Sequence, residues 1–140
     1  MSFPKILDCI VAEGIRLEVE GKATILGFYG VVPHVEIGIK DPKKPVSLHF
    51  ILMSSGLPPE TMPAQYKGRV RILKPDGSTL KDSGEMELEL VATPSDKVTP
   101  RAMLVFGISS VIYDTAGKYT FRLLVQPDIK YDASFTIVHP

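Results

Sequence analysis

Serine, aspartate and histidine are the residue types in this chain that could build a hydrolase site. The candidates are Ser109, Ser110, Asp114, His34, His49 and His139. A serine nucleophile needs a histidine base in contact with it and an acid behind that base. Neither serine lies in a Gly-x-Ser-x-Gly turn, and no histidine has the local sequence of a triad base. We therefore predict that the chain is not an enzyme, and a hydrolase with an unrecognised site is the weakest alternative.

Carboxylates at two predicted turns are the residues that could bind calcium. Asp76 and Asp82 flank one turn, and Asp128 and Asp132 flank another. Calcium takes several carboxylate and carbonyl oxygens from such loops, as in calcium-dependent lipid-binding sandwiches of the C2 kind. Aspartate is also common in turns, because its side chain bonds to nearby backbone. The sequence thus favours no metal and no cofactor, and the alternative is a calcium- or small-molecule-binding domain.

Zinc and a reactive thiol are the other chemistries that the residue types allow. The three histidines and the one cysteine show no Cys-x-x-Cys or His-x-x-x-His spacing. The cysteine, Cys9, lies in an apolar segment, and free cysteines are among the most buried residues of proteins. We expect Cys9 to be buried and inert.

Proline and glycine divide the chain into short pieces that have the composition of β-strands. Twelve prolines and eleven glycines separate segments rich in Val, Ile, Thr, Tyr and Phe. No segment keeps an apolar helical pattern over three turns, and a single helical turn is expected at residues 58–65. The expected strands are 6–12, 14–20, 23–29, 46–53, 66–73, 84–92, 101–113, 118–126 and 131–138. Gly107 is expected to bend or bulge its strand.

The clearest alternation predicts a charged pair of strands. In residues 84–92 apolar side chains alternate with Glu85, Glu87 and Glu89. Arg69 and Arg71 alternate with apolar residues in the preceding strand, and a Pro-Asp-Gly turn follows it. We expect the glutamates to face the arginines as a solvated row rather than to form a cation site.

The segment between Ser109 and Val125 predicts a corner rather than a catalytic loop. Tyr119 opens an alternating strand two residues after Gly117, and Asp114 precedes that glycine. This Asp-x-x-Gly-x-Tyr pattern resembles the corner of immunoglobulin-like sandwiches, in which a tyrosine bonds to backbone upstream. The core tryptophan and paired cysteines of those domains are absent. The fold we expect is all-β: one domain, 1–140, forming a two-layer antiparallel immunoglobulin-like β-sandwich of about eight or nine strands.

Composition excludes several classes of function. Lys+Arg and Asp+Glu both number 16, so the zero net charge lacks the basic excess of proteins that hold nucleic acid by its phosphates. No apolar run is long enough for a transmembrane helix, and acidic residues interrupt the N-terminal apolar stretch where a signal peptide would be apolar. With one cysteine, no disulfide can form within the chain. We expect a cytoplasmic protein without nucleic-acid or membrane partners.

Residues 8–30 carry a resemblance to a known family. An Arg-x-Glu step at Arg16 and Glu18 is followed by a Gly-Lys turn and then by a Leu-Gly-x-Tyr strand. The matching residues are Arg16, Glu18, Gly21, Lys22, Leu26, Gly27 and Tyr29. This order resembles the opening of a family of uncharacterised bacterial immunoglobulin-like sandwich proteins, although the spacing of residues 31–45 is unusual for it. The resemblance implies a cytosolic bacterial domain with no assigned activity.

The resulting expectation for function is a non-enzymatic binding or assembly module. A sandwich without a convergent catalytic set acts through its loops or its sheet edges. A protein partner or self-association would supply the contact. The basic, proline-containing loop 38–47 either meets an acidic partner or protects a sheet edge.

Overall fold

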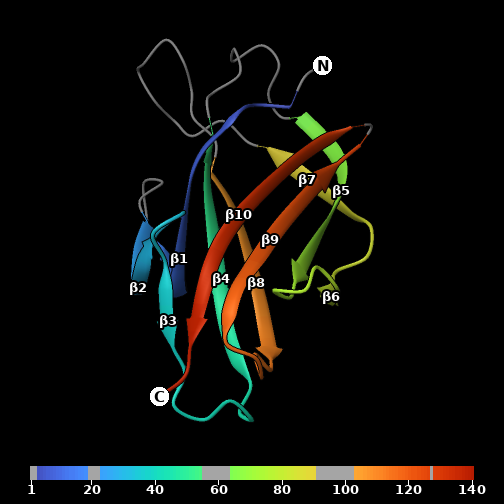
Figure 1. Ribbon diagram of the computed structural model, residues 1–140. Coiled ribbons are helices and arrows are strands. Elements are labelled where there is room, and N and C mark those ends of the chain that lie inside the picture. The colour runs from blue at the N-terminus through green and yellow to red at the C-terminus, as the bar shows by residue number, and fades with distance from the viewer. Residues whose placement is uncertain (1–2, 19–22, 55–63, 91–102, 127) are drawn as a thin grey trace.

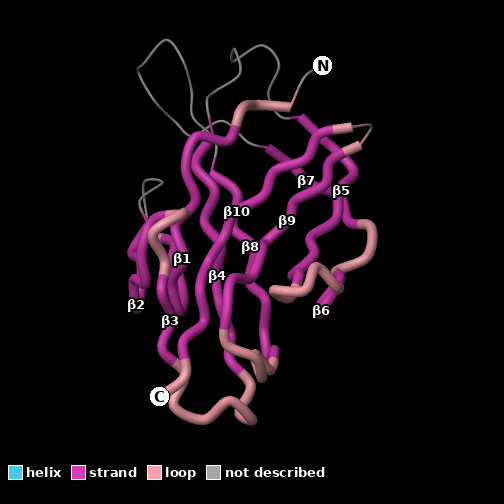
Figure 2. The backbone as a smooth tube through the Cα atoms, in the orientation of Figure 1, coloured by secondary structure: helices cyan, strands magenta, loops and turns pink. Residues whose placement is uncertain are grey.

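The computed structural model describes residues 3–18, 23–54, 64–90, 103–126 and 128–140, and this part of the chain is all-β with no helix (Figure 2). It forms ten strands in two sheets. The strands are β1 (Ile6–Leu17), β2 (Ala23–Val31), β3 (Glu36–Gly38), β4 (Val46–Ser54), β5 (Ala64–Leu73), β6 (Thr79–Asp82), β7 (Met86–Leu90), β8 (Met103–Val111), β9 (Gly117–Val125) and β10 (Ile129–Val138).

One sheet has four strands in the order β2-β1-β4-β8, all paired antiparallel. The predicted N-terminal hairpin is confirmed as the β1–β2 pair, whose Gly21-Lys22 turn lies outside the described residues. β1 runs without a break over what the sequence divided into two strands. β2 and β8 are the edge strands of this sheet.

The other sheet has six strands, and it is mixed rather than purely antiparallel. Its order is β3-β10-β9-β5-β6, and β7 also pairs with β5. β3 pairs parallel with β10, so the expectation of wholly antiparallel sheets was wrong at this strand. β3 has three residues, which are too few to show alternation. The prediction of eight or nine strands therefore did not include it, and the structure has ten.

The two sheets face each other across a shared apolar core, with β9 and β10 lying in front of β4 and β8 in Figure 1. Phe50 of β4 stacks on Phe121 of β9 with ring centroids 4.4 Å apart, and it also contacts Phe135 of β10. The alternation predicted for β9 and β10 is confirmed, because every second side chain is buried. Such period-two burial is what places one face of each strand in the core.

The corner between β8 and β9 carries the chain from one sheet to the other. Tyr119 is fully buried and its hydroxyl donates to the Thr115 carbonyl at 2.7 Å, which confirms the predicted backbone hydrogen bond. The ring of Tyr113 packs edge-on against Tyr119 with centroids 5.2 Å apart. The Tyr113 hydroxyl is buried without a hydrogen-bond partner in the described part of the chain. The pair therefore holds one satisfied and one unsatisfied hydroxyl.

One local expectation needs correction, and another lies mostly outside the described residues. Gly107 does not bulge: it pairs regularly with His49, and the irregularity lies at Ser109–Ser110, where Ser110 has φ 56°. A Cβ at Gly107 would lie 3.0 Å from His49 Nε2, so the His49 ring would have to shift slightly to accept one. The expected helical turn at 58–65 lies mostly outside the described residues, and its last two residues begin β5.

The expected arginine–glutamate pairing was also wrong. Arg69 and Arg71 form ion pairs with Asp82 of the short strand β6, at 3.7 and 2.8 Å. The glutamate strand β7 pairs with the first half of β5, where Glu87 lies opposite Lys67. β6 takes the position beside the arginines because the Pro-Asp-Gly turn returns the chain at once, with Ser78 N donating to Asp76 Oδ1 at 2.9 Å.

Candidate interaction surface

The six candidate triad residues are not brought together. His49 Nδ1 lies 3.0 Å from the Glu13 carbonyl, and His139 Nε2 lies 3.1 Å from the Tyr113 carbonyl. Asp114 accepts a hydrogen bond from Thr115, and the Ser110 amide donates to Ser47 Oγ. His34 makes a backbone turn with Val31. Among the described residues, no hydrogen bond joins a candidate serine or aspartate to a histidine.

Three of the four aspartates considered for calcium, Asp76, Asp82 and Asp132, have other partners. Arg122 donates two hydrogen bonds to Asp132, at 2.8 and 3.0 Å, and these hold the pKa of that carboxyl below its ordinary value. The Gly84 amide and the Arg71 guanidinium lower the pKa of Asp82 in the same way. In the part of the chain that the structure describes, no three His, Cys, Asp or Glu side chains gather as a metal site requires.

The middle of the outer face of the four-stranded sheet is apolar, and neither the candidate triad residues nor the candidate metal residues account for this surface. The same outer face also carries Asp8, His49 and Arg16. Leu26, Phe28 and Val31 of β2 are exposed to 46%, 59% and 40%. The pairing register places these three beside Gly14, Ala12 and Ile10 of β1, which point away from the core. We call this surface the apolar face. Its members are Ile10, Ala12, Leu26, Phe28, Val31, Ile51, Met53, Met103 and Val105.

The centre of the apolar face is densely packed. Ile51 of β4 and Ala12 of β1 are fully buried, yet neither belongs to the core cluster between the sheets. Ile51 lies between Ile10 of β1 and Val105 of β8. A sheet face that meets only water normally alternates polar side chains with the inward apolar ones. This face instead carries a band of apolar side chains across all four strands, and Asp8 and His49 lie in the rows on either side of Ile51.

The outer face of the six-stranded sheet has the opposite character. Asp132, Arg122, Arg71 and Asp82 lie in one row across β10, β9, β5 and β6. Each arginine in the row is bonded to the aspartate on its outer side. We call this surface the charged face. Its charges are paired and solvated, as expected for a face that remains in water.

The edge strands differ in the same way between the two sheets. β2 (ATILGFYGV) and β8 (MLVFGISSV) are nine residues each and contain no charged residue and no proline. In the six-stranded sheet β3 and β6 are short, and β7 carries Glu87 and Glu89. Short length and charge are the usual devices that keep an edge strand from pairing with another chain. The four-stranded sheet lacks both.

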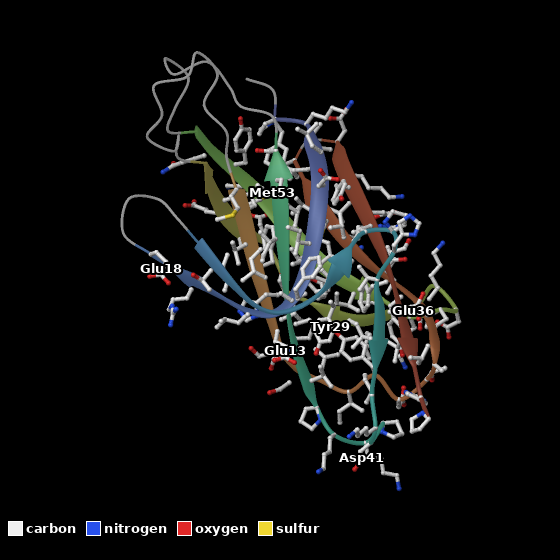
Figure 3. The ribbon with its side chains drawn as sticks, turned by 90° about the vertical axis from the view of Figure 1, so that its left-hand side faces the viewer. Glu13, Glu18, Tyr29, Glu36, Asp41 and Met53 are labelled. Atoms are coloured by element: carbon white, nitrogen blue, oxygen red, sulfur yellow. The ribbon has the colours of Figure 1, made fainter. Side chains whose placement is uncertain are left out.

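A carboxylate and a tyrosine mark the β2 side of this sheet (Figure 3). Tyr29 Oη donates to Glu13 Oε1 at 3.3 Å, and burial together with Glu13 raises the pKa of Tyr29. Gly27 has φ +62°, and a Cβ there would meet the Glu13 carboxyl carbon at 2.5 Å. A register shift between Val11 and Ala12 makes Tyr29 an extra residue of β2. Figure 3 also shows Met53 higher on β4.

A groove of about 440 Å³ opens where β8 faces β5, β6 and β7 across the gap between the sheets. Val70, Ile72, Phe106 and Ile108 line it, with Lys81 also among its lining residues. A second hollow of about 360 Å³ lies on the charged face, where three cationic and two acidic side chains line it. The lining residues of these hollows show no convergent set of reactive groups. The groove adds apolar surface to the β8 edge of the four-stranded sheet.

Comparison with known proteins adds no second source of evidence. No protein-family model, no curated protein and no solved structure matches this chain. The resemblance of residues 8–30 to bacterial sandwich proteins therefore stays a prediction. The described residues contain no helix that is long and apolar enough to cross a membrane.

The sequence did not reveal the apolar face, although a signal was present. β4 places Phe50, Ile51 and Leu52 in succession, and all three are buried. An uninterrupted apolar run in a strand indicates burial on both faces. β2 and β8 also lack a strict alternation of polar and apolar residues, and this too indicates apolar side chains on both faces of the sheet.

Proposed function

We propose that this protein is a non-enzymatic binding or assembly module, and that it contacts its partner through the apolar face. The observation that carries the proposal is the row of exposed apolar side chains on β2, led by Phe28 at 59% exposure. Contiguous apolar surface of this kind marks protein interaction sites on folded domains. The uncharged edges of the same sheet extend the surface in the plane of the strands.

The energetic argument favours a covered face. Burying apolar surface contributes roughly 25 cal/mol per Å², and an aromatic ring such as Phe28 contributes more area than any aliphatic side chain. Aromatic anchors at the centre of an interface supply a large share of the binding free energy. Phe28 is flanked by Leu26 on its own strand and lies opposite Ala12 on β1, so a partner would meet a shallow apolar surface around one ring.

We also propose that the two sheets form an immunoglobulin-like sandwich in a cytoplasmic bacterial protein. The Tyr119 hydrogen bond to the backbone upstream supports the first part, since such domains use a tyrosine at this corner. The parallel β3–β10 pair departs from a purely antiparallel sandwich. A single buried cysteine, with no disulfide in the chain, supports the compartment.

Phe28→Lys tests the interaction surface. The tagged protein and this variant would each be used to capture proteins from lysate at two salt concentrations, with the retained proteins quantified by mass spectrometry. We expect the native chain to retain a stoichiometric partner at both salt concentrations and Phe28→Lys to lose it, because a lysine ammonium in an apolar contact must be desolvated.

Val138→Lys is the matched control. Val138 lies at the end of β10 in the six-stranded sheet, and its exposed fraction, 40%, equals that of Val31 on the apolar face. This variant should retain the same partner as the native protein, and both variants should melt close to the native temperature. Equal retention by Phe28→Lys and Val138→Lys would show that the apolar face is not the contact surface.

A further inference from the structure

We propose that the free edge of β8 binds an extended peptide segment of a partner protein, which adds a further strand to the four-stranded sheet. The inward side chains of the added strand enter the groove between β8 and strands β5, β6 and β7. These side chains are apolar, except for one carboxylate that pairs with Lys81. The site goes beyond the proposed function, because it lies at the opposite edge of the sheet from Phe28 and β2.

The backbone of β8 is a regular edge. From Met103 to Ile108 it pairs residue by residue with β4, and the register shifts only beyond Ile108. Among the described strands, β4 is the one neighbour of β8. Every second residue of an antiparallel edge strand directs its amide and carbonyl away from that neighbour. Residues 103–108 therefore present about 20 Å of free donors and acceptors, at about 3.3 Å per residue. An extended peptide backbone matches this alternation.

The groove lies where the inward side chains of an added strand point. The six-stranded sheet continues past β5 to β6, whereas the four-stranded sheet ends at β8. Phe106 and Ile108 belong to the core side of β8, and each keeps 9% exposure beside the groove. Val70 and Ile72 of β5 line its other wall. A valine or leucine of the added strand thus meets apolar side chains from both sheets, and its burial favours binding.

Lys81 adds a charge that selects the partner. It lies opposite Ile72 in the β5–β6 pair. Directly opposed residues of an antiparallel pair project from the same face of a sheet, so Lys81 projects from the inner face and lines the groove. The described residues that line the groove include no acid, and the ion pairs of the described residues do not include Lys81. A glutamate or aspartate on the inward side of the added strand completes this pair.

The other edge of the same sheet, β2, is a poorer template. Gly27 has φ +62°, which interrupts the extended conformation of the strand, and a register shift makes Tyr29 an extra residue. Such bulges twist an edge strand away from a flat neighbour. No residue of β2 lines the groove, and Figure 1 shows β2 and β6 on opposite sides of the molecule. The geometry therefore places the added strand at β8.

Fluorescence anisotropy with synthetic peptides tests the site. Each labelled peptide would be as long as β8, with threonine alternating with valine, and glutamate would replace a different valine in each. With protein titrated to about 1 mM, a range that includes weak binding, we expect at least one peptide to bind saturably. That peptide would then be N-methylated at the amides of every second residue, in either of the two alternating sets. One set should abolish binding and the other should leave it within about twofold, because an added strand uses every second amide.

A charge reversal tests the role of Lys81. Lys81→Glu should weaken binding of the glutamate peptide about three- to tenfold, and a peptide with lysine in place of that glutamate should regain the lost affinity. Lys118→Glu is the matched control, because Lys118 is an exposed lysine of β9 and the net charge changes equally. Phe28→Lys should bind the peptide as the native protein does, so failure of this site and failure of the apolar face are distinguishable.

Amide hydrogen exchange locates the added strand. In the free protein every second amide of residues 103–108 should exchange fast, and the peptide should slow these amides without affecting β2. Slow exchange of all six amides in the free protein would show that the edge is already paired, which would overturn the proposal. Absence of saturable binding by every peptide, equal effects of the two methylation sets, or protection of β2 instead of β8 would overturn it as well.

Discussion

The outer faces of the two sheets differ although both sheets share one core. On the six-stranded sheet, arginines and aspartates form a paired row from Asp132 to Asp82. On the four-stranded sheet, the row across the middle of the outer face carries Val31, Ile51 and Val105. Because both inner faces meet the same apolar core, the difference cannot come from the packing between the sheets. It lies in the outer faces themselves, since one carries a row of paired charges and the other carries a band of apolar side chains.

The energetic character of the two faces follows from this difference. Exposed ion pairs such as Arg122–Asp132 contribute little to stability, and their main effect is to keep a face solvated. Apolar side chains that cover Ile51 already contribute to the folded chain, and they would contribute again on binding a partner. The comparison therefore separates a face that stabilises the fold from one that chiefly maintains solubility.

Truncation of one side chain on each outer face should give the largest difference in the free energy of unfolding. Ile51→Ala removes a fully buried side chain, and we expect it to lower the free energy of unfolding by about 2–5 kcal/mol, as in other tightly packed sites. Leu124→Ala removes a partly exposed side chain beside Arg69 on the charged face and should cost about 1 kcal/mol or less. Urea denaturation measures both. Equal losses would mean that the apolar face is no better packed than the charged one.

Removal of the hydroxyl from Tyr119 or from Tyr113 should give a smaller difference in stability. The two variants test whether a buried tyrosine hydroxyl stabilises the fold only when it has a hydrogen-bond partner. Tyr119→Phe removes a hydroxyl that donates to the Thr115 carbonyl and should cost about 0.5–1.5 kcal/mol. Tyr113→Phe removes a buried hydroxyl that has no partner in the described residues, so it should leave stability unchanged or increase it. If thermal melting showed no difference between native protein and Tyr119→Phe, the corner interpretation would be wrong.

The ion-pair row should give the smallest effect, and that effect should depend on pH. The hydrogen bonds from Arg122 lower the folded-state pKa of Asp132, so the unfolded chain takes up a proton first as the pH falls. The stabilisation is therefore present at neutral pH and is lost as the pH falls through the folded-state pKa. Asp132→Asn should cost about 0.2–1 kcal/mol at neutral pH, with a smaller loss in high salt. A cost that stays the same at acidic pH would contradict the ion-pair assignment.

The parts of the fold that the sequence predicted are those with local period-two alternation. Phe121 and Phe135 lie where polar and apolar residues alternate along β9 and β10, so their burial followed directly from the pattern. The partner of Arg71 could not be predicted, because it depends on the register of β6 rather than on the composition of β7. The pairing of β3 with β10 joins residues that are far apart in the chain, which no local pattern specifies.

The sequence predicted that the protein acts through its loops or sheet edges, but it did not predict which strands form those edges. A sandwich that acts through its edges was expected, and the uncharged strands β2 and β8 were visible in the sequence. Which strands form edges depends on pairing between distant segments, since β8 reaches its position beside β4 only through long-range contacts. The position of Ile51 on an apolar outer face required the sheet to be known.

The parallel β3–β10 pair has a consequence for the order in which the chain can fold during synthesis. Residues 36–38 are synthesised well before their partners at 136–138. Phe121 and Phe135, which fill the core against Phe50, belong to β9 and β10, which follow the other described strands in the chain. A nascent chain ending before residue 117 would expose both faces of its four-stranded sheet, since β9 and β10 would be missing. Long-range pairing of this kind slows folding, so the newly made protein must keep two apolar surfaces out of contact with its neighbours until β10 has been synthesised.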